Sequence, residues 1–118
     1  MKWFIGVLII CSSLFSNVTV VASTGDTLEA EIAAEASRCD YYVFFDNEGK
    51  VLETMKNPHK DVQGGASSKL VAMLKEKKVS HMIASNFGNK LIKHLRSNHI
   101  KYTIHKGGIS DVIQSLQK

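Results

Sequence analysis

The spacing of apolar and polar residues predicts strands in the first half of the chain. A run rich in β-branched residues, Val18–Ser23, predicts a first strand, and the aromatic run Tyr41–Asp46 predicts a strand buried on both faces. The alternating segment Lys50–Lys56 follows a turn at Asn47–Gly49, so these two strands are expected to form a hairpin. Leu28–Ser37 has helical propensity but few apolar positions, which leaves a short helix and an ordered loop as alternatives.

The second half of the chain has apolar residues at helical spacing, interrupted by short strand-like runs. The expected elements are a helix from Gly65 past Leu74, a strand at Ser80–Ser85, a helix at Gly88–Asn98, a strand at Lys101–Ile104 and a last helix capped by Ser110 that reaches Leu116. Strands that alternate with helices imply parallel strands joined by crossover connections, and therefore an α/β fold.

The first residues have the pattern of an export signal. Lys2 precedes the apolar run Trp3–Phe15, which gives the charged start and short hydrophobic core of a secretory signal. We expect residues 1–16 to form a signal peptide or an N-terminal anchor, with a boundary between 13 and 23, and residues 18–118 to form one domain. Export, to a bacterial periplasm, is the preferred interpretation. An uncleaved membrane anchor is the alternative.

The cleavage point and the first strand compete for the same residues. Val21 and Ser23 are suitably small for a cut before Thr24, but this cut would remove the predicted first strand. A cut nearer Ser13 or Ser16 would preserve it.

Composition and charge narrow the class of protein. The chain has 118 residues, of which 44% are hydrophobic and 22% charged, as in a soluble globular domain. Its net charge of +4 is not concentrated in a basic run with interleaved aromatic residues, so nucleic-acid binding is not expected. Without the leader, Cys39 is the only cysteine and has no partner for a disulfide within the chain. Three roles are open for Cys39: a small residue packed in the core, a metal ligand or a reactive thiol.

The loop Asn57–Ala66 is the main candidate for a binding site. His59 and the pair Gly64 and Gly65 precede a helix whose first amides have no intrahelical partner, and glycine lets the backbone approach a ligand closely. An anion or the sulfide face of a cluster suits such a site; a helix start that merely needs glycine for its turn is an equal alternative. Ser85–Asn89 is a second helix start of this kind, and both are expected near the carboxyl ends of strands, where ligands bind in open α/β sheets.

The residues that carry catalysis in other proteins do not form recognisable motifs. The five histidines lack the spacing of a zinc-binding helix, and no cysteine pair accompanies them. Cys39 is followed by Asp40, whose charge disfavours a thiolate. We therefore expect a protein that is not an enzyme, with His59 as the best histidine ligand because it lies in the glycine-containing loop.

Several short motifs, in this order, are similar to those of one family. They are Asp46, Asn57-Pro58, Gly64-Gly65-Ala66, the run Met82–Gly88 and Ile100-Lys101-Tyr102, and they resemble the dinitrogenase iron-molybdenum cofactor biosynthesis family, which includes nitrogenase accessory factors and orange proteins. The resemblance implies a ribonuclease H-like three-layer α/β/α fold, with a five-stranded mixed sheet of order 3-2-1-4-5 and strand 2 antiparallel. It also implies that Val18–Ser23 is the first strand and that Arg38 corresponds to the arginine usual in the family after the first loop.

The function implied by the resemblance is binding or carriage of an iron-, molybdenum- or copper-containing sulfur cluster, without catalysis. We expect Cys39 to supply a soft ligand and His59 a borderline one, while Gly64 and Gly65 donate amides and Asn86 contributes from the second helix start. A metalloprotein partner is implied, and membrane contact only through an uncleaved leader. The alternative is a protein-interaction module of the same fold without metal, because the loop supplies one histidine where some relatives have a richer set.

Overall fold

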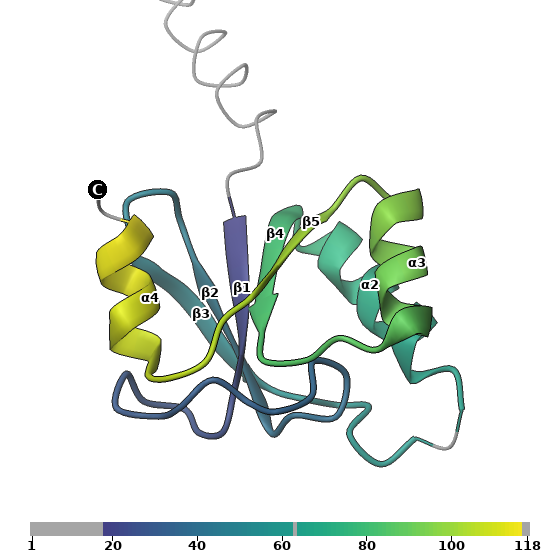
Figure 1. Cartoon of the computed structure of the whole chain (residues 1–118), viewed down its shortest axis with the longest axis horizontal. Coiled ribbons are helices and arrows are strands. Elements are labelled where there is room, and N and C mark those ends of the chain that lie inside the picture. Colours follow the sequence, from purple (N-terminus) through teal and green to yellow (C-terminus); the bar gives the residue numbers. More distant parts are fainter. Residues whose placement is uncertain (1–17, 63, 117–118) are drawn as a thin grey trace, which may run out of the picture.

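A computed structural model describes residues 18–62 and 64–116 of the chain (Figure 1). The elements are β1 (Val18–Ser23), β2 (Tyr41–Phe45), β3 (Val51–Lys56), α2 (Ala66–Glu76), β4 (Val79–Ala84), α3 (Asn89–Ser97), β5 (Lys101–Ile104) and α4 (Ile109–Leu116). None of the described helices is long and apolar enough to cross a membrane.

The strands form one sheet in the order β3-β2-β1-β4-β5, as predicted. β1 pairs antiparallel with β2, where Thr19 is opposite Phe45, and parallel with β4, where Val20 is opposite Met82. β2 also pairs antiparallel with β3, and β4 pairs parallel with β5. β2 is therefore the one strand of the sheet that runs against the others, which confirms the predicted mixed topology.

Helices cover both faces of the sheet and give the predicted three layers (Figure 1). Successive residues of a strand point to opposite faces, so β1 contributes to two cores. The core under α2 and α3 includes Val20, Ala22, Tyr42, Phe44, Leu74, Met82 and Leu95. The core under α4 includes Val21, Val43, Phe45, Ile83, Ile109 and Val112.

The first strand lies at the centre of the sheet. Val20, Val21 and Ala22 have no exposed surface, because both edges of β1 are paired and both faces are covered. The strand predicted at Val18–Ser23 is thus confirmed, and a cut before Thr24 would remove the middle of the sheet. The predicted leader, residues 1–16, lies outside the described residues.

Two local predictions are resolved by hydrogen bonds. Leu28–Ser37 is an ordered loop and not a helix. Its backbone is fixed by Ile32, whose N–H donates to the Gly107 carbonyl oxygen at 2.8 Å, and by Ala33, whose N–H donates to the Ala22 carbonyl oxygen at 2.8 Å. These hydrogen bonds to other elements take the place of the hydrogen bonds that a helix would form within itself. The few apolar residues of the loop pack against the sheet.

The prediction that Ser110 caps the last helix is wrong. α4 begins at Ile109, and the Ser110 hydroxyl donates to the carbonyl oxygen of Leu28 at 3.0 Å. The hydroxyl therefore holds the helix to the loop after β1 and leaves the helix amides to other acceptors.

The parallel strands define two edges of the domain. The carboxyl edge comprises the loops that leave β1, β3, β4 and β5, at residues 24–40, 57–62 with 64–65, 85–88 and 105–108. The amino edge comprises the turns at 46–50, 77–78 and 98–100, where the helices end and the parallel strands begin. In Figure 1 the carboxyl edge is at the bottom and the amino edge is at the top.

Candidate functional site

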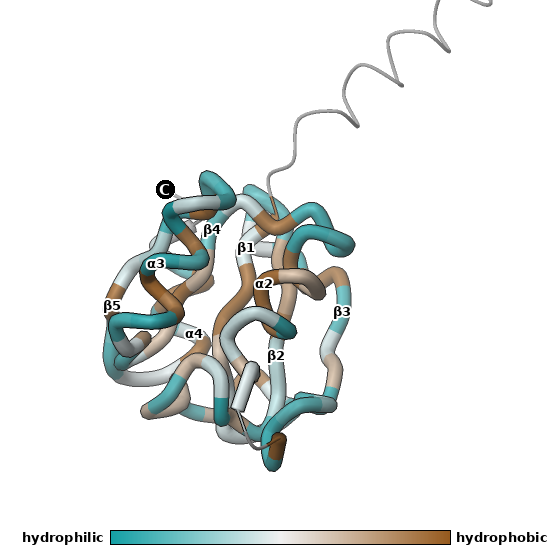
Figure 2. The backbone as a smooth tube through the Cα atoms, turned by 90° about the vertical axis from the view of Figure 1, so that its right-hand side faces the viewer, coloured by the Kyte–Doolittle hydropathy of each residue, from teal (hydrophilic) through white to brown (hydrophobic). Residues whose placement is uncertain are grey.

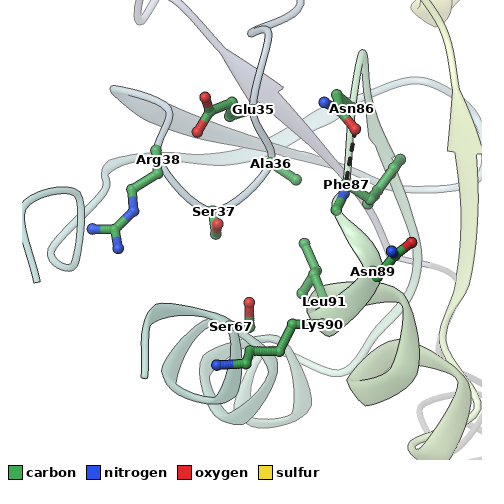
Figure 3. Close-up of a pocket in the computed structure, with 11 residues that line it drawn as sticks. Glu35, Ala36, Ser37, Arg38, Ser67, Asn86, Phe87, Asn89, Lys90 and Leu91 are labelled. Carbon is green, nitrogen blue, oxygen red and sulfur yellow. Dashed lines mark hydrogen bonds between the residues drawn. The ribbon is translucent and has the colours of Figure 1, made fainter. Parts of the chain in front are cut away.

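A pocket of about 260 Å³ opens at the carboxyl edge (Figure 3). Its walls come from the loop before β2, the start of α2 and the segment from β4 into α3; the lining residues are Glu35, Ala36, Ser37, Arg38, Ser67, Asn86, Phe87, Gly88, Asn89, Lys90 and Leu91. The chain leaves β1 toward β2 on one side, while β4 adjoins β1 on the other. The pocket therefore lies at the type of switch point where open α/β sheets bind ligands.

The polar side chains of the pocket are mostly hydrogen-bond donors. Ser37 and Ser67 face each other across the hollow, and the Lys90 amine extends beside Ser67 (Figure 3). Arg38 and Glu35 line the same pocket, but the guanidinium of Arg38 and the carboxylate of Glu35 both point away from the hollow. This arrangement favours an anionic ligand.

Two helices begin at the pocket. α2 starts after Gly65, which has φ 72°, and α3 starts after Gly88, which has φ 77° and ψ 151°. Neither start has a side-chain cap, and neither first turn contains an acidic residue. The partial positive charge of both N-termini is therefore not neutralised locally, and it adds to the charge of Lys90.

Arg38 also fixes the loop that follows β3. Its guanidinium donates to the carbonyl oxygen of Lys60 at 2.9 Å and to that of Val62. Asn57 ties the same loop to the strand entrance, because its side-chain amide donates to the carbonyl oxygen of Cys39 at 2.9 Å. The loop after β3 is therefore held against the loop before β2.

The environment of Cys39 is that of a buried thiol. Only 5% of its surface is exposed, and its Sγ lies 3.2 Å from the carbonyl oxygen of Tyr41. Burial raises the pKa of the thiol to about 11, hydrogen bonds including one with Tyr42 oppose this shift, and the Asp40 charge adds a smaller increase. Cys39 is therefore protonated at neutral pH, which is unfavourable for a metal ligand.

Cys39 lines a second pocket of about 310 Å³, which adjoins the first. The two pockets share Glu35 and Arg38, and the second also includes Asp40 and Lys60, whose side chains form an ion pair. The predicted cysteine thus lies next to the pocket of the two helix starts and outside its lining.

The other predicted site residues are dispersed along the carboxyl edge. Asn86 lines the first pocket, and its Oδ1 accepts a hydrogen bond from the Gly88 N–H at 3.3 Å. Gly64 and Gly65, both with positive φ, lead into the helix that supplies Ser67. His59 is half-buried and lines neither pocket.

The histidine and cysteine do not form a metal-binding cluster. Within residues 18–62 and 64–116, no three His, Cys, Asp or Glu side chains are grouped to hold a metal ion. The ligand roles of Cys39 and His59 remain predictions, and they would require these side chains to move or an additional ligand from elsewhere.

Sequence reasoning did not identify several pocket residues. Ser37, Ser67 and Lys90 belong to no motif and are distant in sequence, while Arg38 was identified only through the resemblance. The available signal was the pair of glycine-preceded helix starts after strands. It identified two walls of the pocket, and Lys90, the second residue of α3, could have been added from its place beside Gly88.

Three solved structures are similar to this chain. The crystal structure of PH0822 is 22% identical in sequence, with a TM-score of 0.71, and the match covers 85% of this chain and 89% of that chain. The NMR structure of a NifB-like protein from Thermotoga (TM1290), of the DUF35 family, is 25% identical, with a TM-score of 0.70 and coverage of 84% of this chain and 85% of that chain. The apo form of the orange protein from Desulfovibrio gigas is 17% identical, with a TM-score of 0.77 and coverage of 85% of this chain and 86% of that chain. The likenesses to PH0822 and the orange protein show a shared fold.

Sequence comparison identifies the family. No curated protein sequence matches this chain. The sequence model of the dinitrogenase iron-molybdenum cofactor family matches residues 17–118, which include every described strand and helix. Because that match covers most of the chain, this protein belongs to the dinitrogenase iron-molybdenum cofactor family.

Proposed function

We propose that this protein binds an anionic metal-sulfur cluster at the carboxyl edge and carries it without catalysing a reaction. Family membership suggests a role in the biosynthesis or binding of iron-molybdenum cofactor. The observation that supports cluster binding is the pocket lined by Lys90 and by two helix starts without side-chain caps. Metal-sulfur clusters of this type carry negative charge, which these groups would stabilise.

The size of the pocket supports a compact inorganic cargo. Its volume of about 260 Å³ is at or below the roughly 300–1,000 Å³ of pockets for drug-sized ligands. Donors from Ser37, Ser67 and Asn89 line it from different sides. A cluster held by charge and hydrogen bonds can be released to a metalloprotein partner without breaking a protein-metal bond, which suits a carrier.

The fit is weaker for direct ligation. Cys39 would have to lose a proton whose pKa is about 11, and His59 lines neither pocket. We therefore assign the main binding contribution to the cationic pocket and keep Cys39 and His59 as predicted ligands of a rearranged, loaded state.

Binding of tetrathiomolybdate, followed by its visible absorption, tests the proposal. Lys90→Ala is expected to weaken binding about tenfold, because a hydrogen bond to a charged group is worth roughly 1.5 kcal/mol or more. Lys93→Ala is the matched control, since Lys93 is exposed on the same helix and does not line the pocket. Equal affinities of the two variants, or no binding by the wild-type protein, would contradict the proposal and favour an interaction module without metal.

A further inference from the structure

The outer edge of β5 is unpaired. β5 lies at one end of the sheet and, among the described strands, pairs only with β4; Figure 2 shows it at the margin of the molecule opposite β3. The β4–β5 register is regular, and the pairing continues past the strand because the His105 N–H donates to the Ala84 carbonyl oxygen at 3.0 Å. A regular edge strand presents backbone donors and acceptors that can pair with another extended segment.

β3, the strand at the other end of the sheet, is less suited to such pairing. Its register with β2 is irregular between Phe44 and Phe45, and Glu53 in the middle of β3 forms an ion pair with Lys77 at an N–O distance of 2.8 Å. Bulges and charges within an edge strand discourage pairing with another chain. β5 has a regular register and carries no charge after its first residue, Lys101.

Apolar surface lies beside the β5 edge on both faces of the sheet. On the α3 face, Tyr102 packs against the core, and Ile104, two residues further along the strand, has 60% of its surface exposed. On the α4 face there is a hollow of about 160 Å³, below the roughly 300–1,000 Å³ of pockets for drug-sized ligands. This hollow therefore suits a single apolar side chain. Its lining residues are His81, Ile83, Thr103, His105, Val112 and Ser115.

The charge of this part of the domain indicates the chemistry of a partner. Residues 77–110, which form β4, α3 and β5, contain seven Lys and Arg residues and no Asp or Glu. Residues 18–76, counted in the same way, contain ten acidic residues and six Lys and Arg residues. Lys101 and Lys106 are exposed at the two ends of the β5 edge, and neither forms an ion pair within residues 18–62 and 64–116.

These lysines favour an acidic partner over a second copy of this chain. Two copies that paired through β5 would bring Lys101 and Lys106 of one copy close to the same residues of the other, and like charges across paired strands are destabilising. An acidic segment places opposite charges there instead.

We propose that the outer edge of β5 binds an extended acidic segment of a partner protein by β-strand addition. The backbone of the segment pairs with β5, an apolar side chain occupies the hollow beside Val112, and carboxylates lie near Lys101 and Lys106. In this mode of recognition the backbone hydrogen bonds supply affinity, and the pockets for alternate side chains supply specificity. The proposal does not depend on the cargo of the pocket at the carboxyl edge.

Titration of the full-length protein with a capped peptide of alternating glutamate and valine tests the proposal. NMR of the protein amides is expected to show shifts and slower hydrogen exchange at Lys101–Ile104, with little change at Val51–Lys56 on the other edge. The same peptide with lysine in place of glutamate is expected to bind several-fold more weakly. No binding of the acidic peptide, larger shifts at β3 than at β5, or equal affinities for the two peptides would overturn the proposal.

A matched pair of variants compares the two edge strands. Ile104→Glu is expected to weaken binding of the acidic peptide about tenfold, because the added strand would bury part of the exposed isoleucine and the new carboxylate repels the peptide. Leu52→Glu on β3 is the control, since Leu52 is similarly exposed, at 52%, and is expected to leave the affinity unchanged. Equal weakening by the two variants would contradict binding at β5.

Charge reversal tests the contribution of the lysines. The double variant Lys101→Glu and Lys106→Glu is expected to bind the acidic peptide several-fold more weakly than the wild-type protein. The control is Lys50→Glu with Lys56→Glu, which reverses exposed lysines at the two ends of β3 and is expected to bind like the wild type. Equal affinities of the two double variants would overturn the proposal.

Sedimentation of the protein without peptide tests the competing occupant. A wild-type dimer that Ile104→Glu converts to a monomer would place a second copy at the β5 edge and overturn the proposal, whereas a wild-type monomer is expected. Thermal unfolding of every variant verifies that it is folded.

Discussion

The side-chain amide of Asn57 donates a hydrogen bond of 2.9 Å to the carbonyl oxygen of Cys39. The same amide donates to the carbonyl oxygen of Ser37 at 3.1 Å, and its oxygen accepts from the N–H of His59 at 2.9 Å. One side chain thus satisfies three backbone groups in two loops. Asn57 is itself buried, with 9% of its surface exposed.

Asn57→Ala is therefore expected to destabilise the domain by about 2 kcal/mol, because buried polar groups lose their partners. Urea unfolding followed by circular dichroism measures the change. Asn98→Ala is the control, since Asn98 is half-buried and donates one such bond, to His94 at 2.8 Å. A cost no larger than that of the control would show that the tie between the loops contributes little.

Gly88→Ala is expected to cost about 1–3 kcal/mol through backbone strain alone. An added Cβ at Gly88 would meet nothing within 4 Å, but φ 77° with ψ 151° is a conformation that side chains disfavour. Gly25→Ala is the matched control, because its φ is not in the positive region and its Cβ would make an ordinary 3.4 Å contact with Ala30. Equal losses of stability in the two variants, measured by urea unfolding, would exclude strain as the cause.

Stability is expected to fall as the pH rises from about 9 to about 11 because of Cys39. The folded protein keeps the thiol protonated up to a pKa of about 11, whereas the unfolded chain ionises near the ordinary value of 9.0. The contribution is complete below pH 9 and is lost through this window, to an extent of about 2–3 kcal/mol.

Urea unfolding of the wild-type protein and of Cys39→Ala across this pH window measures the contribution. The variant lacks the thiol but keeps Tyr42, whose pKa is raised by burial and by Cys39, so the difference between the two pH slopes reports Cys39 together with its coupling to Tyr42. Identical slopes would contradict the raised pKa.

Acid is expected to destabilise the domain through His81. Burial, with a smaller contribution from Lys101, lowers the pKa of its imidazole in the folded state. Stability is therefore present above the unfolded pKa of 6.5 and falls as the pH decreases below it. Since the ring is only half-buried, the loss is below about 1 kcal/mol.

His81→Gln is expected to reduce this acid-side loss, as measured by thermal unfolding between pH 7 and 5. The glutamine also retains a polar partner for Thr103, whose hydroxyl lies 2.6 Å from Nε2 of the histidine. His105→Gln is the control, since His105 directly follows the neighbouring strand β5. An unchanged pH slope in His81→Gln would show that other groups carry the acid sensitivity.

The strand pattern could be predicted because it depends on local composition and on burial. β-Branched and aromatic runs identified β1 and β2. Both strands are buried on both faces of the sheet, so both faces require apolar residues. β3 also followed from its alternation, although it is an edge strand and almost fully exposed. The strand order came from the family resemblance, because pairing across the sheet leaves no signal in a single sequence.

The sequence predicts the two helix starts of the pocket but not which charged side chains line it. Glycine at a helix start marks a backbone conformation, so Gly65 and Gly88 could be found locally. Arg38 and Lys90 are separated by about half the chain and share a pocket only after β1 and β4 have paired. Ser110 was misassigned for the same reason, because its acceptor, the Leu28 carbonyl, is distant in sequence.

The central position of β1 has a consequence for how the chain is made. The first strand to be synthesised cannot acquire both neighbours until β4, which ends at Ala84 of the 118 residues, has followed it. Sheets that depend on such non-local pairing fold slowly. Most of the polypeptide must therefore be available before the sheet closes, so the domain is expected to complete its fold only late in its own synthesis.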